Sequence, residues 1–306
     1  MRVPSCLQTG CLTYARTVGH FLFVVVMFTV FGAFLSCPTP AHADTTISIP
    51  ADWPGGNVIT VPGGETLTIL AAAGSPTNPT VIQVAGTVKI VGHSGTISNL
   101  YITSAAATAL TIENLNISAP TGSNMNDSKP AVALVSGSTL TVEGANTLKR
   151  DAKVAGIHVP DPNTLIIEGT GSLIITANAA SGTYAGGAGI GGNGGGFSPA
   201  LGDGTPGETA GAITIQGTVT IEAYGGDVAS MPDHGGMSAG IGGGGGSGSA
   251  SGQVGNKGGH GGGGGTFAIN GGSVKADIGG GDAGQCPGGG PGSQGAGATV
   301  TITRIS

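Results

Sequence analysis

Four polar residues in one short segment have the chemistry of an acid–base set. Asp151, His158, Asp161 and Glu168 bring three carboxylates and one imidazole into a part of the chain with few other charges. Carboxylates and histidine are common general acids and bases in enzymes. One alternative is therefore a catalytic group. The other is a solvated corner between strands, and the sequence favours it because most acidic residues lie singly between strands.

Glutamates also recur at comparable places in the strand pattern. Glu168 and Glu222 both occupy outward positions of repeated segments, so they are predicted to stack on one face. As residues of a solvated strand face they need no catalytic role.

A second group gathers ligands for a soft metal ion. Met231, His234 and Met237 place two thioethers and an imidazole on one glycine-flanked segment, a combination that suits copper or zinc. No CxxC or HxxxH spacing accompanies them. The sequence therefore favours a polar loop, and it predicts neither a metal nor a cofactor.

Aromatic side chains could supply platforms for sugar rings, because they present a flat apolar face with a polar tip. They make up only 4% of the chain. Tyr184 and Tyr224 flank glycine-rich runs at similar places in the pattern, so they are the candidate ligand-binding residues. The alternative is that both tyrosines pack at corners of the fold.

Segments of alternating apolar and polar residues must position these groups. Strict alternation is typical of a strand with one buried face. The segments recur at separations of 43, 30, 25, 48 and 54 residues when one central apolar residue of each is aligned: Ile69, Ile112, Val142, Ile167, Ile215 and Ile269.

Repeats of this length predict a solenoid, because one strand–bend–strand unit cannot cover its own apolar face and stacked units can. The predicted fold class is all-β, a parallel β-helix with glycine-rich loop insertions. The uneven spacing is assigned to loops of different lengths at the corners. The alternative is an antiparallel sandwich with hairpins at the glycine bends.

The composition divides the chain into three parts. Residues 1–43 combine a positive start, an apolar run and a small-residue cleavage site, which is typical of a secretory signal peptide. An uncleaved anchor and a lipoprotein site at Cys37 are the alternatives. Residues 44–181 carry the first β-helix rungs, and residues 182–306 continue them through long glycine runs.

The glycine runs are a feature of their own. Residues 182–297 hold 46 of the 63 glycines of the chain, yet strands survive among them. The runs are predicted either to stack on one another, since glycine permits close approach of backbones, or to be mobile.

Charge and cysteine content restrict the function further. Arg2 and Arg16 leave with the signal peptide, so the formal charge changes from −6 to −8. Nucleic-acid binding requires a basic patch, and the sequence has none. Cys286 is the one cysteine after residue 43, so the mature chain is predicted to form no internal disulfide.

The runs GAGIGG (187–192) and AGIGGGGG (239–246) alternate with strands such as ITIQGTVTIEA and follow AGIHVPDPNTLIIEGTGSL. In this they resemble a group of secreted bacterial glycine-rich proteins, described as carbohydrate-binding-domain or pectin-lyase-like surface proteins. The resemblance covers roughly residues 155–281. It implies a right-handed parallel β-helix at the cell surface and brings no catalytic residues.

The sequence as a whole favours an exported, non-enzymatic surface or matrix protein that is glycan-binding or adhesive. Its expected partner is extracellular polysaccharide or cell-wall glycan, with no nucleic acid and with membrane contact only through an uncleaved signal. A polysaccharide lyase or glycoside hydrolase on a pectin-lyase-like fold is the enzymatic alternative. A scaffold, such as one segment of a larger adhesin, is the other.

Overall fold

A computed structural model of the chain describes its secondary structure over the following residues: 45–47, 58–69, 80–93, 95–98, 100–118, 129–150, 153–177, 185–196, 203–226, 235–248, 257–285 and 291–303. In these ranges the protein is built from strands, turns and loops, and nothing there forms a helix that could cross a membrane. One compact unit spans Ala43–Ser306. The predicted signal peptide, residues 1–43, lies outside the described residues.

The strands form three sheets. The first sheet has nine strands in chain order: β1 (Thr45–Ile47), β3 (Thr66–Ile69), β5 (Thr87–Gly92), β8 (Ala109–Glu113), β11 (Ser138–Glu143), β14 (Thr164–Gly169), β17 (Ala212–Ile215), β20 (Thr266–Ile269) and β23 (Thr299–Ile302). The second sheet has eight: β2 (Val58–Val61), β4 (Thr80–Val84), β7 (Leu100–Ser104), β10 (Val132–Ala133), β13 (Ile157–His158), β16 (Ile190–Gly191), β19 (Ile241–Gly242) and β22 (Ile278–Gly279). The third sheet has six: β6 (Ile97–Ser98), β9 (Asn116–Ser118), β12 (Ala145–Arg150), β15 (Ser172–Ala177), β18 (Thr220–Tyr224) and β21 (Ser273–Ala276).

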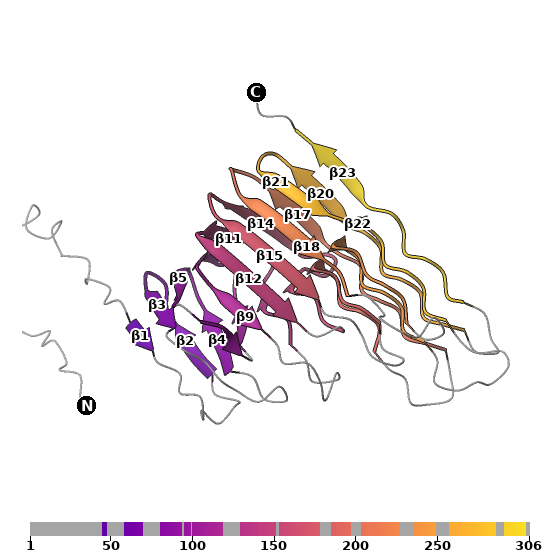
Figure 1. The fold of residues 1–306 in the computed structure, drawn as a ribbon, viewed down its shortest axis with the longest axis horizontal. Helices are drawn as coiled ribbons and strands as arrows, with labels where there is room; N and C mark the ends of the chain where they lie inside the picture. Colours follow the sequence, from indigo (N-terminus) through magenta and orange to yellow (C-terminus); the bar gives the residue numbers. More distant parts are fainter. Residues whose placement is uncertain are drawn as a thin grey trace, which may run out of the picture. The chain divides into compact units, whose positions relative to one another are not determined.

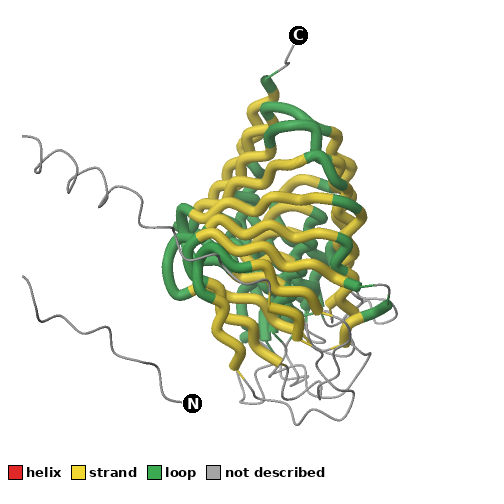
Figure 2. Tube along the Cα trace, turned by 90° about the vertical axis from the view of Figure 1, so that its left-hand side faces the viewer, coloured by secondary structure: helices red, strands yellow, loops and turns green. Residues whose placement is uncertain are grey.

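All neighbouring strands within these sheets run parallel. From β5 onward the chain visits the first, third and second sheets in turn and then returns to the first. Figure 1 and Figure 2 show the resulting coils stacked one upon the next. The predicted parallel β-helix is confirmed. The antiparallel sandwich is wrong, because hairpins would make neighbouring strands antiparallel.

Apolar side chains from successive coils stack in columns inside the β-helix. One column in the first sheet consists, from strand to strand, of Leu140, Ile167, Ile215 and Ile269. The first three are at most 1% exposed. Burying one such side chain contributes about 1.5–3 kcal/mol, so these columns are a main source of the stability of the coils.

The predicted column is out of register at two points, between Val142 and Ile167 and between Ile69 and Ile112. It places Val142 beside Ile167, but Val142 lies opposite Gly169, and Ile167 lies opposite Leu140. Alternate residues of a strand share a face, so an alternating pattern cannot distinguish two registers that differ by two residues.

The aligned column also leaves out one coil. Ile69 lies opposite Gly92 of β5, and Leu67 lies opposite Ile90, which in turn lies opposite Ile112. The spacing of 43 residues between Ile69 and Ile112 therefore contains a complete further rung, and the strand–glycine–strand pattern VIQVAGTVKIV at residues 81–91 predicts its strands.

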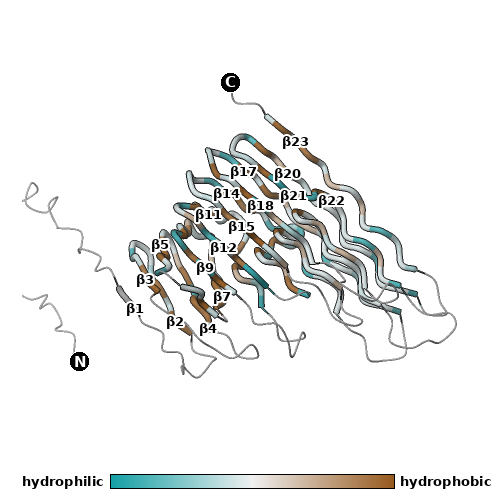
Figure 3. Tube along the Cα trace, in the orientation of Figure 1, coloured by the Kyte–Doolittle hydropathy of each residue, from teal (hydrophilic) through white to brown (hydrophobic). Residues whose placement is uncertain are grey.

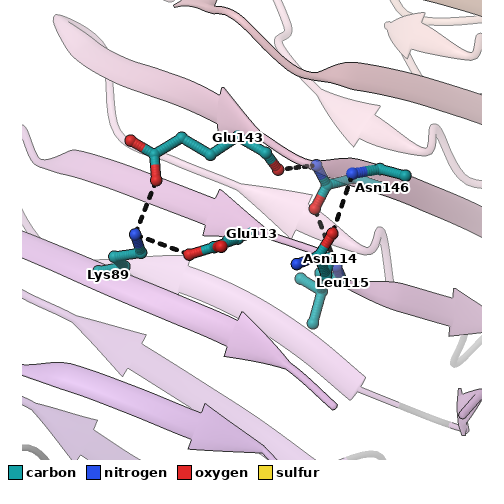
Figure 4. Close-up of polar contacts among 7 residues, drawn as sticks. Lys89, Glu113, Asn114, Leu115, Glu143 and Asn146 are labelled. Atoms are coloured by element: carbon teal, nitrogen blue, oxygen red, sulfur yellow. Dashed lines mark hydrogen bonds and ion pairs between the residues drawn. The ribbon is translucent and has the colours of Figure 1, made fainter. Parts of the chain in front are cut away.

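The corner between the first and third sheets requires an unusual backbone. Asn114 has a φ of 52°, and Gly144 takes the same place one coil later with a φ of 61°. The side-chain amide of Asn146, a residue that is 1% exposed, forms hydrogen bonds with backbone groups at this corner. Its Oδ1 accepts the Leu115 N–H at 2.9 Å, and its Nδ2 donates to the Glu143 carbonyl at 2.8 Å (Figure 4). The buried polar side chain is thus tolerated because it bonds backbone groups that the turn leaves without strand partners.

The glycine runs form a second kind of interior, made of stacked backbone. Residues 239–248 are all buried, although they consist only of Gly, Ala, Ile and Ser. Within this run the Gly244 N–H donates to the Glu208 carbonyl at 3.1 Å, and the Gly244 carbonyl accepts the Gly262 N–H at 2.8 Å. Figure 3 shows these segments largely pale, whereas the strands carry brown apolar residues. The described runs therefore stack, which is the first of the two predicted alternatives.

Close approach of backbones explains why this interior is glycine. A Cβ on Gly244 would lie less than 3.0 Å from the backbone of Asn193, and one on Gly262 would meet the backbone of Glu208 equally closely. Real Cβ atoms essentially never show such distances. The segments can reach hydrogen-bonding distance only because the side chain is absent.

Candidate functional site

The four residues of the predicted acid–base set have separate surroundings. Asp151 lies outside the described residues. Asp161 is exposed in a turn, where its backbone N–H donates to the Thr209 carbonyl at 3.0 Å. Glu168 accepts a hydrogen bond from Gln216 Nε2 at 2.7 Å. The described contacts of Asp161 and Glu168 therefore lead to different neighbours and do not bring the two residues together.

His158 instead pairs with a carboxylate that the sequence did not single out. Its Nε2 lies 2.7 Å from Glu208 Oε2 and 2.9 Å from Asn193 Nδ2. One nitrogen cannot both donate to the carboxylate and accept from the amide. The carboxylate accepts only, so it favours the form of His158 that donates.

Asn193 fixes this pair from both sides. Its backbone N–H donates to Glu208 Oε2 at 3.1 Å, and its Oδ1 accepts the Ala155 N–H at 2.8 Å. Burial raises the pKa of the Glu208 carboxyl group. The hydrogen bond and charge of His158 and the hydrogen bonds of Asn193 lower this pKa by a larger amount, so it lies below its ordinary value of 4.5. The arrangement ties β13 to two glycine-rich segments, which is a structural role.

The predicted stack of Glu168 and Glu222 is wrong. Glu168 belongs to β14 of the first sheet, whereas Glu222 belongs to β18 of the third sheet and lies opposite Ile174. The two glutamates sit in different halves of the strand–bend–strand unit, and the corner between the halves separates their faces.

A stack of glutamates does occur elsewhere on the first sheet. Glu113 and Glu143 lie opposite each other in β8 and β11, and Lys89 Nζ lies 2.7 Å from a carboxylate oxygen of each (Figure 4). Hydrogen bonds to Glu113 and then to Glu143 raise the pKa of Lys89. Because the lysine neutralises carboxylates that would otherwise repel, this cluster stabilises stacked coils. The matching segments TIEN (111–114) and TVEG (141–144) are the sequence signal that could have predicted the stack of Glu113 and Glu143.

Tyr224, one of the two predicted ligand-binding residues, lies at the end of β18 with 39% of its surface exposed. Its hydroxyl donates to Glu222 Oε2 at 2.7 Å, and Lys275 Nζ lies 5.7 Å from the centre of its ring. Lys275 Nζ is also 3.4 Å from Glu222 Oε2. The hydrogen bond from Tyr224 and the charge of Lys275 lower the pKa of Glu222. These contacts hold the ring in a fixed position at the surface.

Tyr224 borders an open groove between two successive coils. A first hollow of about 410 Å³ is lined by Tyr224, Met237 and Ser238 from one coil and by Asp277 and Asp282 from the next. Its remaining lining residues are small or apolar: Gly225, Gly226, Ala239, Ile278, Gly279 and Gly280.

A second hollow of about 440 Å³ continues the groove. It shares Met237 and Asp282 with the first hollow and adds the amide side chains of Gln285 and Gln294. Gln294 Nε2 lies 3.5 Å from Asp282 Oδ1, a long contact that leaves the carboxylate open to a ligand. The sequence could not reveal this groove, because its residues meet only when the coils stack.

The predicted metal ligands are only partly described. Met231 and His234 lie outside the described residues, as does Tyr184. Met237 is 50% exposed and lies where the two hollows adjoin. Within the ranges that the structure describes, His, Cys, Asp and Glu form no group of three that could hold a metal ion.

Comparison of the chain with protein-family models, with curated proteins and with solved structures finds no match in any of the three. The resemblance to glycine-rich carbohydrate-binding-domain and pectin-lyase-like surface proteins therefore stays a prediction.

Proposed function

We propose that this protein is an exported, non-catalytic β-helix that binds an extracellular polysaccharide along the groove beside Tyr224. The groove is the observation that carries the proposal. It consists of two open, adjoining hollows, and it combines one exposed aromatic ring with carboxylate and amide side chains.

Each feature of the groove suits a sugar chain. An aromatic ring can pack against the apolar face of a pyranose, while a few well-placed polar groups hold its hydroxyls. Two adjoining hollows of several hundred Å³ accommodate a linear ligand more than one sugar unit long. Glycine backbone lines much of the groove, so little side-chain entropy is lost when a ligand binds.

The setting of the groove supports binding without cleavage. Tyr224 and Glu222 are engaged with each other and with Lys275. The candidate acid–base residue His158 lines neither hollow; it bonds Glu208 and Asn193 instead. The signal peptide predicted at residues 1–43 supports placement outside the cytoplasm, at the cell surface or in a secreted matrix.

The proposal is tested by direct binding of the purified chain to neutral, acidic and amino-sugar oligosaccharides. At least one class is expected to bind, and Tyr224→Ala is expected to weaken that binding about tenfold, or about 1.4 kcal/mol. Tyr101→Ala is the matched control, because Tyr101 lies on β7 of the second sheet and lines neither hollow.

Two results would contradict the proposal. No binding of any oligosaccharide class would remove the glycan-binding function. Release of new reducing ends or unsaturated products from a polysaccharide would show the enzymatic alternative, a lyase or glycoside hydrolase.

A further inference from the structure

The groove carries charge of one sign. Asp282 lines both hollows and Asp277 lines the first, and no basic side chain is among the lining residues of either hollow in the described part of the chain. Asp277 is exposed and Asp282 is half-buried, so both carboxylates can meet a ligand.

The nearest lysine does not reverse this charge. The Lys275 ammonium group lies 3.4 Å from Glu222 and 5.7 Å from the centre of the Tyr224 ring, on the rim of the groove. Together, the described side chains of Lys275, Glu222, Asp277 and Asp282 carry a net charge of −2. The whole chain has the same sign, with a formal charge of −6. A groove with this field repels polyanions and concentrates cations.

We infer that the groove selects a polysaccharide that carries free amino groups, an amino-sugar polymer that is at least partly deacetylated. This inference rests on the proposed function and names the chemical class of its ligand. Protonated amino groups pair with the carboxylates of Asp277 and Asp282. The Gln294 and Gln285 amides bond sugar hydroxyls, and the Tyr224 ring packs against a sugar face.

The arrangement of the carboxylates suits a repeating cation better than a single one. Asp277 follows β21 directly, while Asp282 lies beyond β22 where the two hollows adjoin. A polymer with an amino group on each sugar presents charges along its length, so one chain in the groove can meet both carboxylates. Acidic polysaccharides would place carboxylates against carboxylates, which costs affinity.

The experiment compares three oligosaccharides of equal length by titration calorimetry: a glucosamine hexamer, its fully N-acetylated counterpart and a galacturonate hexamer. A mildly acidic buffer keeps the amino groups of the glucosamine hexamer protonated. The glucosamine hexamer is expected to bind tightest and the galacturonate hexamer not to bind. Affinity for the glucosamine hexamer should fall steeply between about 0.01 M and 1 M salt, as the Debye length falls from about 30 Å to 3 Å.

Aspartate variants test whether Asp277 and Asp282 bind the amino groups of the ligand. Asp277→Asn and Asp282→Asn should each weaken binding of the glucosamine hexamer about threefold to fivefold, as expected for ion pairs near the surface. Both should leave binding of the N-acetylated hexamer nearly unchanged. Asp161→Asn is the matched control, because Asp161 is an exposed aspartate that lines neither hollow.

The outcomes separate this inference from the function on which it rests. Equal, salt-independent binding of the glucosamine and N-acetylated hexamers would overturn the charge selection and leave glycan binding intact. Preference for the galacturonate hexamer would do the same. Failure of every oligosaccharide to bind would remove both proposals.

Discussion

The coils have two kinds of interior. The first is a set of columns of buried apolar side chains, mostly isoleucine, leucine and valine, that extends from Val61 to Phe267. Beyond residue 185 the coils extend into runs whose interior is backbone packed on backbone, and glycine provides the space. The first interior is stabilised by side chains that leave water, the second by hydrogen bonds that only bare backbones can reach. Truncating a buried side chain should therefore destabilise the first interior, and adding a methyl group to a buried glycine should destabilise the second.

The largest effect is expected in the side-chain columns. Ile215→Ala should destabilise the fold by about 2–5 kcal/mol, because the cavity adds to the lost burial of the side chain. The measurement is the midpoint of urea unfolding. Ile302→Ala, at the outermost position of the same column on β23, changes a side chain that is 73% exposed and should cost about 0.5 kcal/mol or less. Equal losses in the two variants would mean that the column does not run through the structure as described.

The converse change tests the glycine stack. Gly244→Ala adds one methyl group against the backbone of Asn193 and should cost about 3 kcal/mol, since packed backbone cannot move aside. Gly297→Ala is the control, because a Cβ there meets nothing within 4 Å. Hydrogen exchange should show faster exchange of residues 239–248 in the first variant alone. Unchanged protection in Gly244→Ala would show that the runs do not pack on one another.

The corner at Asn146, between the first and third sheets, gives a third test. Asn146→Ala should cost about 1–3 kcal/mol, because the buried Leu115 N–H loses its acceptor. Asn116→Ala removes an exposed hydrogen bond to Thr96 and should cost much less. Thermal unfolding of both variants gives the comparison, and a loss in Asn116→Ala as large as that in Asn146→Ala would contradict the role of the buried amide.

The smallest effect is expected for the pair of His158 and Glu208, which joins β13 to a glycine-rich segment. The folded-state pKa of Glu208 lies below 4.5, so its ionised form stabilises the fold above about pH 4.5, and this contribution is lost as the pH falls through the folded-state pKa. Glu208→Gln should be less stable than the parent by under about 1 kcal/mol at neutral pH, because the side chain is 47% exposed. The difference should shrink on acidification. A difference in stability that grows in acid would contradict the predicted sign.

The sequence was enough to predict the strands and their parallel stacking. An apolar face on each short strand–bend–strand unit needs a cover, and the next unit supplies it. The register between Val142 and Ile167 was not predictable in this way, because residues two apart share a face. The strand–glycine–strand pattern of residues 81–91 predicts the strand that carries Ile90, but the aligned column of central residues omits it.

The candidate site was less accessible from sequence. Tyr224 could be singled out by its place beside a glycine run, but Asp277, Asp282 and Gln294 come from the following coil. Their approach to Tyr224 depends on the path of the glycine runs, which carry almost no side-chain pattern. Glu208 and Asn193 were missed for the same reason, since they reach His158 from glycine-rich segments far along the chain.

Both interiors and the groove depend on coils that stack in parallel register, and paired cysteines test that stacking most directly. Ile166 of β14 lies opposite Thr214 of β17, and neighbouring strands lie about 4.8 Å apart, within the range that a disulfide spans. With the native cysteines replaced by serine, Ile166→Cys combined with Thr214→Cys should form a cross-link that mass spectrometry detects. Ile166→Cys combined with Ile174→Cys should not. A hairpin about the bend at Gly169 would bring Ile166 beside Ile174, so the opposite result would contradict the parallel β-helix and the groove built on it.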